Sequence, residues 1–302
     1  MKPIVECVPN FSEGRRQEVI DQIVAAMGQV TGVQVLDVQS DPDHNRAVVT
    51  LVGAPQAIVE AAFQGIDRAA RLIDMNHHRG SHPRMGATDV VPLVPVQGVT
   101  MDDCVALARQ LGERVGNELG IPVYLYEAAA TRPDRRNLAD VRRGEYEGLK
   151  EEIAINPDRA PDFGPAAMGS AGATAIGARP PLIAFNVYLN TADLTAAQAI
   201  ARAVRHSSGG LRYVKALGLL VEGQAQVSMN LTDYRHTPIH RVLELIRAEA
   251  ARYGLSVTRC EIVGLLPAQA LFDAARFYLQ LHDFSIDQVL ENRLAGLEHP
   301  SG

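Results

Sequence analysis

The sequence predicts an α+β protein made of two ferredoxin-like (βαββαβ) subdomains. Strand-like and helix-like segments follow one another in the order β-α-β-β-α-β, and the same order returns after the Pro180–Pro181 pair. The chain has 302 residues, 47% of them hydrophobic, which is enough for two ordinary cores. We therefore expect subdomains at 1–179 and 180–302, each with helices mainly on one sheet face. The two bare sheet faces are expected to pack against each other with the helices outside, and the crevice between them is then a natural ligand site.

The elements of the first half follow from hydrophobic spacing, proline and glycine. Apolar residues recur at helical spacing between Val19 and Met27, and Pro55 suits the first turn of a long helix. Pro92 and Pro95 indicate an edge or irregular strand, because proline donates no hydrogen bond to a ladder. The expected segments are a strand at 3–8, a helix at 16–30, strands at 33–38 and 47–53, a helix at 54–74, a strand at 89–96, a further helix at 101–119 and a further strand at 123–127.

The second half repeats this order with clear turn and helix-end signals. Glu222 and Gly223 lie between two strand-like runs and predict a hairpin. Thr237 can cap the second helix, Pro238 suits its first turn and Gly254 ends it. The expected segments are a strand at 182–189, a helix from about 195, strands at 212–221 and 224–231, a helix at 237–254, a strand at 256–266 and a closing helix at 268–280.

Composition excludes several classes of protein. A net charge of −6 and a pI near 5.9 argue against a general nucleic-acid binder, which is normally basic. No apolar run approaches the roughly 20 residues of a membrane span, and the N-terminus enters a strand-like run without a signal peptide. An odd number of scattered cysteines fits a reducing compartment, so we expect a soluble, cytoplasmic protein. The cysteines are Cys7, Cys104 and Cys260, and each is interpreted as structural.

Three of the nine histidines fall within six positions, at His77, His78 and His82. Their spacing in a loop rich in proline and glycine matches no common zinc pattern, and no cysteine lies nearby, so we expect no metal. The chain also lacks a Gly-x-Ser-x-Gly nucleophile motif and a phosphate-binding Gly-x-x-x-x-Gly-Lys-Ser motif. These exclusions leave general acid–base chemistry, for which histidine is suited because it titrates near neutrality.

His82 is the candidate catalytic residue of this loop. It stands between Ser81 and Pro83, and a proline restricts the backbone of the residue before it. The neighbouring Arg84 could bind a carboxylate through the two parallel donors of its guanidinium. The alternative is a solvent-exposed histidine without a catalytic role.

Three other polar segments leave alternatives open. The acidic run at 37–43 offers Asp37, Asp41 and Asp43 either as carboxylates that orient His82 or as a solvated turn. Asn10 and Ser12, at a strand-to-helix junction, either meet an anion or cap the helix. The segment at 157–181, rich in glycine, alanine and proline, is either a flexible linker or a loop whose small residues let backbone approach a flat ligand.

Seven separated stretches resemble one family. "VECVPNFSEG", "RLIDMNHHRGSHPRMGATDVVPLVPV", "PVYLYE", "RRGEYEGL", "PDFGP", "GATAIGAR" and "LIAFNVYL" together resemble glutamate formimidoyltransferase, the formiminotransferase of histidine breakdown. In animals this activity is fused to a cyclodeaminase, whereas this chain looks like a stand-alone transferase. The resemblance implies two ferredoxin-like subdomains, a folate in the groove between them and a homodimer.

The resemblance also implies an activity and a set of residues. The formimino group of N-formimino-L-glutamate is transferred to tetrahydrofolate, the co-substrate, without a metal. His82 matches the catalytic histidine, while Arg84 and Arg179 are candidates for the substrate carboxylates, and Asn10 is a further substrate-binding candidate. Compared with the animal members, the folate loop is one residue shorter, and Gln39 stands where they carry an aspartate. The residues matched to that loop are Gly164, Pro165, Ala166, Ala167, Met168, Gly169, Ser170, Ala171 (a bulky aromatic in the animal members) and Gly172.

Three alternatives remain beside this interpretation. The donor could be a formyl compound, so that the protein moves formyl groups between glutamate and folate in 5-formyltetrahydrofolate metabolism. The protein could bind folate without turnover, although a pure binder has no need of His82. The histidines could serve a metal-dependent hydrolase, which metal analysis of the purified protein would reveal.

Overall fold

The computed structural model describes residues 2–80 and 82–298. The chain forms two compact units, one ending at Pro180 and the other beginning at Pro181. Each unit is an α+β structure with one sheet and its own hydrophobic core, as the sequence predicts. Among the described residues, no helix has both the length and the apolar character needed to cross a membrane.

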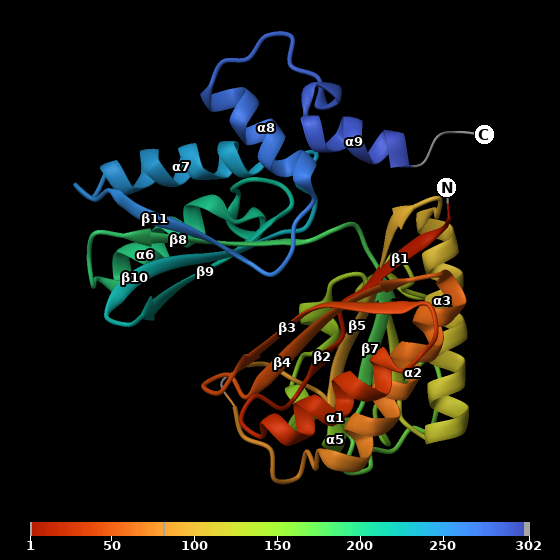
Figure 1. Ribbon diagram of the computed structural model, residues 1–302. Coiled ribbons are helices and arrows are strands. Elements are labelled where there is room, and N and C mark those ends of the chain that lie inside the picture. The colour runs from red at the N-terminus through yellow and green to blue at the C-terminus, as the bar shows by residue number, and fades with distance from the viewer. Residues whose placement is uncertain (1, 81, 299–302) are drawn as a thin grey trace. The chain divides into compact units, whose positions relative to one another are not determined.

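The first unit contains the longer sheet, and its helices α1, α2 and α3 gather on one side of it (Figure 1). Its elements are β1 (Ile4–Cys7), β2 (Asn10–Phe11), α1 (Gln17–Gly28), β3 (Val33–Asp41), β4 (Arg46–Gly53), α2 (Pro55–Leu72), β5 (Thr88–Gln97), α3 (Met101–Arg114), a π-helical turn (Val115–Leu119), β6 (Val123–Glu127), α4 (Leu138–Val141), α5 (Glu145–Glu152) and β7 (Thr174–Ala178), with short 3-10 turns at Pro133–Arg135 and Pro157–Arg159.

Pairing in this sheet follows the ferredoxin-like order and then extends it. β4 lies between β3 and β1, and β1 pairs antiparallel with both β4 and β5. β7 and then β6 add to the other side of β5 as parallel strands. Apolar side chains of α1, α2 and α3 meet those of β1, β4, β5 and β7 in the main core. A smaller core around Leu149 and Tyr126 covers the opposite face of the β5–β7–β6 region.

The structure changes two predictions for this unit. β5 is an interior strand, because β1, β2 and β7 flank it, so the edge-strand alternative is wrong; the irregular-strand alternative is confirmed, because the pairings of β5 with β1 and with β2 each contain a register shift. Of its two prolines, Pro92 lies opposite the interruption between β1 and β2, and its carbonyl accepts the amide of Val8 at 3.3 Å. The segment at 157–181 is not loop throughout, since Thr174–Ala178 forms the buried strand β7. The small residues of this segment gave no recognisable strand pattern. The strand is buried because other residues pack on both of its faces.

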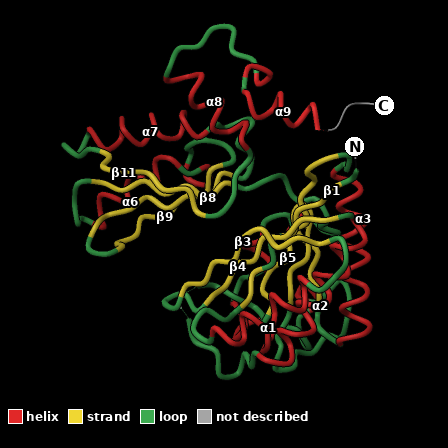
Figure 2. The backbone as a smooth tube through the Cα atoms, viewed as in Figure 1, coloured by secondary structure: helices red, strands yellow, loops and turns green. Residues whose placement is uncertain are grey.

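The second unit is a four-stranded antiparallel sheet in the order β11-β8-β10-β9, which is the ferredoxin-like order. Figure 2 shows its strands in yellow, with helix α7 along one side of them. α6 and α7 pack their apolar sides on one face of it. Its elements are β8 (Ile183–Leu189), α6 (Leu194–Val204), a 3-10 turn (His206–Ser208), β9 (Val214–Val221), β10 (Gln224–Leu231), α7 (Ile239–Ala251), β11 (Val257–Val263), α8 (Ala268–Tyr278), a 3-10 turn (Ile286–Gln288) and α9 (Leu290–Glu298).

Local turn chemistry explains where the elements of the second unit begin and end. Glu222 and Gly223 have φ values of 50° and 78°, so the predicted hairpin uses two left-handed residues. Gly254, at φ 68°, follows α7 as predicted. Thr237 does not cap α7, contrary to the prediction. Pro238 occupies the cap position, and the Thr237 hydroxyl donates to the carbonyl of Arg212, which ties the helix start to β9. The packing of the two bare sheet faces against each other stays a prediction.

Candidate active site

The three clustered histidines have three different environments. His77 is exposed, with its ring 3.8 Å from the Asp74 carboxylate. His78 is buried, and its Nδ1 accepts a hydrogen bond from Arg84 Nε at 3.3 Å while its Nε2 donates to the Asn45 carbonyl at 3.1 Å. His82 is half-buried. Residues 2–80 and 82–298 contain no group of three or more histidine, cysteine, aspartate or glutamate side chains arranged to hold a metal ion.

His82 lies in a positively charged environment. Its ring meets the ring of His44 edge to face, with centroids 6.4 Å apart and planes at 71°. Burial, followed by the nearby charges of Arg46 and Arg142, lowers the pKa of His82 to about 2. The imidazole is therefore neutral near pH 7, so it can accept a proton and can donate only a proton that it has first accepted.

Arg46 and Arg142 reach this place from distant parts of the chain. Arg46 begins β4 and donates to the side-chain oxygen of Asn10, whose amide in turn donates to the Val8 carbonyl at 2.8 Å. Arg142 follows α4 and forms an ion pair with the buried Asp89. The result is two guanidinium groups beside one histidine, each held by a buried polar partner.

Asn45 joins three loops at the base of this site. Its side-chain oxygen accepts the amide of Gly14 at 3.0 Å, its side-chain nitrogen donates to the Arg79 carbonyl at 2.9 Å, and its own carbonyl accepts from His78. Its φ of 50° lies in the left-handed region, which asparagine tolerates better than most residues. Gly14 packs so closely on this turn that a Cβ there would collide with backbone. These bonds set the positions of His44 and Arg46, the two residues that flank Asn45.

The carboxylates of the acidic turn have other partners. Asp41 accepts the backbone amides of Asp43 and His44 at 2.9 Å each, and its second oxygen lies 2.5 Å from Nδ1 of His44. Asp37 accepts the side-chain amide of Gln39 at 3.0 Å. Asp41 therefore orients His44 and reaches His82 only through that second histidine.

The junction before α1 is closed by its own side chains. The buried Glu13 carboxylate accepts the backbone amides of Arg15 and Arg16, each at 2.9 Å. The Ser12 hydroxyl donates to the Gly86 carbonyl at 2.7 Å. The capping interpretation is wrong for Asn10 and Ser12, because α1 begins without a side-chain cap hydrogen bond and Glu13 instead binds the two amides just before the helix.

Arg84 does not serve as the predicted free carboxylate ligand. Its guanidinium binds Glu147 through both terminal nitrogens, at 2.7 and 2.9 Å, and Glu145 at 2.8 Å. The side chain is buried, so these two glutamates compensate its charge and attach α5 to the histidine loop. Sequence alone does not reveal partners 61 and 63 residues away.

Arg179 lies at the other end of the sheet from His82. β5 and β7 run parallel, and Arg179 follows β7 with its amide bonded to the Leu93 carbonyl at 3.1 Å. The histidine loop and the loop at 164–172 precede these two strands. At about 3.3 Å per residue, the five residues of β7 separate Arg179 from them by roughly 16 Å.

The loop at 164–172 is ordered and attached at several points. Ser170 accepts the Met75 amide at 2.8 Å, Ala171 accepts the Ala87 amide at 2.8 Å, and Met168 packs against both hydrophobic cores of this unit. Gly164 to Ala167, together with Gly169 and Ser170, are exposed. This segment is therefore a fixed loop next to the histidine loop, and the linker interpretation does not describe it.

Its glycines have two different roles, which corrects the expectation that all of them admit a ligand. Gly164 and Gly172 have φ values of 81° and 73°, and a Cβ at either would collide with neighbouring backbone, at Ile121 and Met85 respectively. Gly169 has open space where a Cβ would stand. Gly164 and Gly172 are thus required to fold the loop, and Gly169 is the position where a ligand could approach the backbone.

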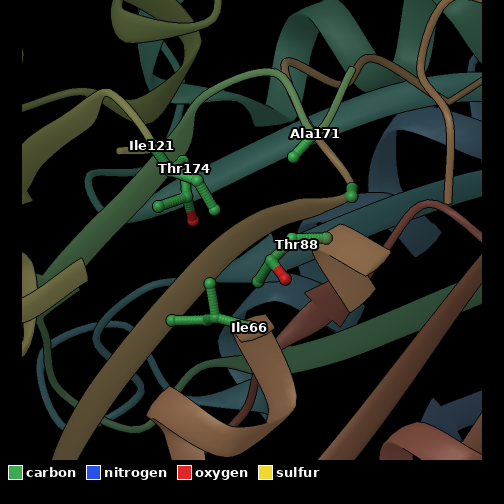
Figure 3. A pocket seen from close by; sticks show the side chains of 7 residues that line it. Ile66, Thr88, Ile121, Ala171 and Thr174 are labelled. Atoms are coloured by element: carbon green, nitrogen blue, oxygen red, sulfur yellow. The ribbon is translucent and has the colours of Figure 1, made fainter. Parts of the chain in front are cut away.

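A small cavity behind this loop does not serve as a ligand site. The side chains of Ile66, Thr88, Ile121 and Thr174 line it together with Ala171 (Figure 3). It is too narrow for a water molecule, and the hydroxyls of Thr88 and Thr174 are buried without a hydrogen-bond partner among the described residues. It is a packing defect between α2 and the strands β5 and β7.

The sequence interpretation missed Arg46, Asn45, Arg142 and Asp89. A weak signal exists for the first two, because "HNR" places polar residues directly before the apolar run that becomes β4. For Arg142 and Asp89 no local signal exists, since an ion pair between positions 53 residues apart depends on the fold.

A half-buried neutral histidine close to two arginines is the arrangement of a protein that binds a small anionic molecule or transfers a proton. Comparison with known families makes this specific. Residues 4–179 match the formiminotransferase domain, N-terminal subdomain, and residues 184–295 match the formiminotransferase domain. The chain belongs to the formiminotransferase family.

Named relatives match nearly the whole chain. It is 50% identical over 300 residues to glutamate formimidoyltransferase of Streptococcus pyogenes serotype M1, covering 98% of this chain and 100% of that protein. It is 53% identical over 295 residues to glutamate formimidoyltransferase of Thermoplasma acidophilum, covering 96% and 97%. The formimidoyltransferase-cyclodeaminase of Rattus norvegicus is 47% identical over 287 residues, which cover 92% of this chain and 53% of that longer protein.

We expect Gly172→Val to destabilise the protein by about 2–4 kcal/mol, because the new side chain meets the Met85 backbone and valine disfavours positive φ. Gly169→Val, in the same loop, should change the free energy of unfolding by less than about 0.5 kcal/mol. Urea denaturation of both variants tests this pair. Equal stabilities would show that the close approach at Gly172 is not a constraint.

Asn45→Ala is expected to lower the free energy of unfolding by about 2–3 kcal/mol, because it removes two hydrogen bonds and places alanine at positive φ. Asn45→Gly removes the same hydrogen bonds, but glycine adopts this φ freely, so the free energy of unfolding should fall less. The comparison, again by urea denaturation, separates the two causes. An Asn45→Ala variant as stable as the wild type would remove the proposed junction of the three loops.

Proposed function

We propose that this protein is a glutamate formimidoyltransferase, which moves the formimino group of N-formimino-L-glutamate to tetrahydrofolate and releases L-glutamate. The observation that carries this is full-length similarity to glutamate formimidoyltransferases at about half identity, together with a neutral, half-buried histidine at the matching place. The homodimer and the cytoplasmic location stay predictions.

The proposed chemistry requires one group that takes a proton and then returns it. N5 of the folate loses a proton when it bonds to the formimino carbon, and the glutamate nitrogen must gain one before it departs as an amine. His82, which is neutral in the free protein, takes the first proton and delivers it to the leaving nitrogen. No external acid is needed, because His82 gives up the proton that it took and is neutral again at the end of the cycle.

Positioning supplies the remaining rate enhancement. A histidine that transfers protons contributes about 10²–10⁴-fold, while holding two substrates in contact contributes more. We assign the folate to the loop at 164–172, with Gly169 as the point of closest backbone approach. The open space at Gly169 and the exposed, small neighbours Ala166 and Ala167 fit a flat ring with donors and acceptors on its edge.

His82→Gln is expected to lower kcat by about 10²-fold or more while leaving the affinity for tetrahydrofolate nearly unchanged, because glutamine fills similar space but transfers no proton. The measurement is steady-state kinetics with N-formimino-L-glutamate and tetrahydrofolate. Full turnover in the variant would remove His82 from the mechanism, and a wild-type protein that turns over only the formyl donor would redefine the reaction.

The same variant changes the pH dependence of stability. The pKa of His82 in the folded protein lies below its ordinary value, so the unfolded chain binds a proton first and stability is lost as pH falls below about 6.5. From about pH 7 to about pH 5, His82→Gln should lose up to roughly 1–2 kcal/mol less unfolding free energy than the wild type. Equal losses of unfolding free energy in the variant and the wild type over this pH range would contradict a neutral His82.

Turnover is expected to persist in a strong chelator, because the chemistry assigned to His82 needs only a proton acceptor and donor. The check is activity after dialysis against EDTA, with metal content measured in the same sample. Loss of turnover that zinc or another divalent ion restores would favour a metal-dependent enzyme.

A further inference from the structure

Arg46 has a donor that the protein does not satisfy. Its Nε is buried and has no hydrogen-bond partner among residues 2–80 and 82–298, while a terminal nitrogen binds the neutral side chain of Asn10. Buried donors of charged groups are normally paired, so an unpaired one beside a candidate catalytic residue indicates a missing acceptor.

The nearby carboxylates cannot fill this role because both are engaged. Asp89 binds Arg142 through both oxygens and also accepts the Met85 amide at 3.1 Å. Asp41, the cross-strand neighbour of Arg46, accepts two backbone amides and lies against the His44 ring. Within residues 2–80 and 82–298, the charge of Arg46 therefore has no dedicated anion.

We propose that Arg46 and Arg142 form a subsite for the α-carboxylate of the amino-acid donor, directly beside His82. This rests on the proposed function and assigns its donor site to residues of β4 and of the segment after α4. A guanidinium carries its donors in a planar fork that matches a carboxylate, which is the chemistry of this substrate class.

The geometry of the substrates decides which carboxylate binds here. In N-formimino-glutamate the α-carboxylate is two bonds from the nitrogen that leaves, so it must lie close to the group that protonates that nitrogen. In folate, the p-aminobenzoyl group separates the glutamate carboxylates from N5. A carboxylate subsite next to His82 therefore fits the donor, and the folate tail binds farther away.

A carboxylate bound in this subsite also changes the pKa of His82. Besides burial, the charges of Arg46, Arg142 and His44 act to keep the free His82 ring neutral. The nearby carboxylates of Asp89 and Asp41 are already paired with Arg142 and His44. A bound carboxylate offsets the arginine charges and raises the pKa of His82 toward neutrality. His82 thus becomes a stronger base only when the donor is in place.

The test uses L-glutamate as the probe, with Arg46→Gln, Arg46→Lys and, as a matched control, Arg71→Gln. Arg71 is an exposed arginine on α2 that pairs with Asp67. Calorimetric titration should show L-glutamate affinity at least about 10-fold weaker in R46Q, less weakened in R46K, and unchanged in R71Q. Equal affinity in R46Q and wild type overturns the subsite.

Steady-state kinetics separates the two carboxylate sources. R46Q should raise KM for the donor about 10-fold or more and leave KM for tetrahydrofolate, and for tetrahydropteroate without its glutamate tail, within about twofold. A KM increase confined to tetrahydrofolate assigns Arg46 to the folate tail and overturns the proposal. If wild-type protein binds L-glutamate through Arg46 but transfers nothing, the proposed function fails while the subsite stands.

A measurement that does not require R46Q covers the case in which this variant does not fold. The ring signals of ¹³C-labelled histidine are followed by NMR against pH, with His82→Gln used to identify the His82 signal. Saturating L-glutamate should move the midpoint of that signal upward by about one pH unit or more. An unchanged midpoint in the presence of bound glutamate overturns the proposal.

Discussion

The close approach of two backbones at Gly86 and Gly172 is the constraint on which the candidate site depends. The two residues pair across an antiparallel bridge, and a Cβ on either would collide with the other segment. Beside this contact, the amide of Ala87 donates a hydrogen bond to the carbonyl of Ala171. Because His82 lies only four residues before Gly86, the same contact holds the histidine loop against the loop at 164–172. Two segments far apart in sequence thereby become the two sides of one site.

Charge around this contact is divided between structural and unsatisfied arginines. Arg84 is fully engaged by Glu145 and Glu147, which holds the fold together, whereas Arg142 binds Asp89 through Nε and one terminal nitrogen. Arg46 keeps a buried donor without a partner among the described residues. Burying a charged group without full compensation is costly, and a protein bears this cost where a ligand later supplies the missing acceptor. The three residues are chemically identical, and only their surroundings separate their roles.

The histidines show the same division. His78 is buried with both ring nitrogens bonded to protein, which makes it part of the scaffold under Asn45. His82 is half-buried and faces a second histidine, which the Asp41 carboxylate orients. The two histidines therefore lie in different surroundings, and the proposed proton transfer belongs to the one that is not part of the scaffold.

The sequence by itself determined the order of the main strands and helices of the two βαββαβ units, because hydrophobic period, prolines and glycines are local signals. It also pointed to His82 and to the loop at 164–172 through the resemblance to formiminotransferases. Only the tertiary structure decided that β5 is interior, that β7 exists, and that Arg84 has its charge paired while the Nε of Arg46 has no partner among the described residues. The physical reason is that burial and ion pairing are properties of contacts between residues tens of positions apart. No local pattern records which partner a strand or a guanidinium will meet.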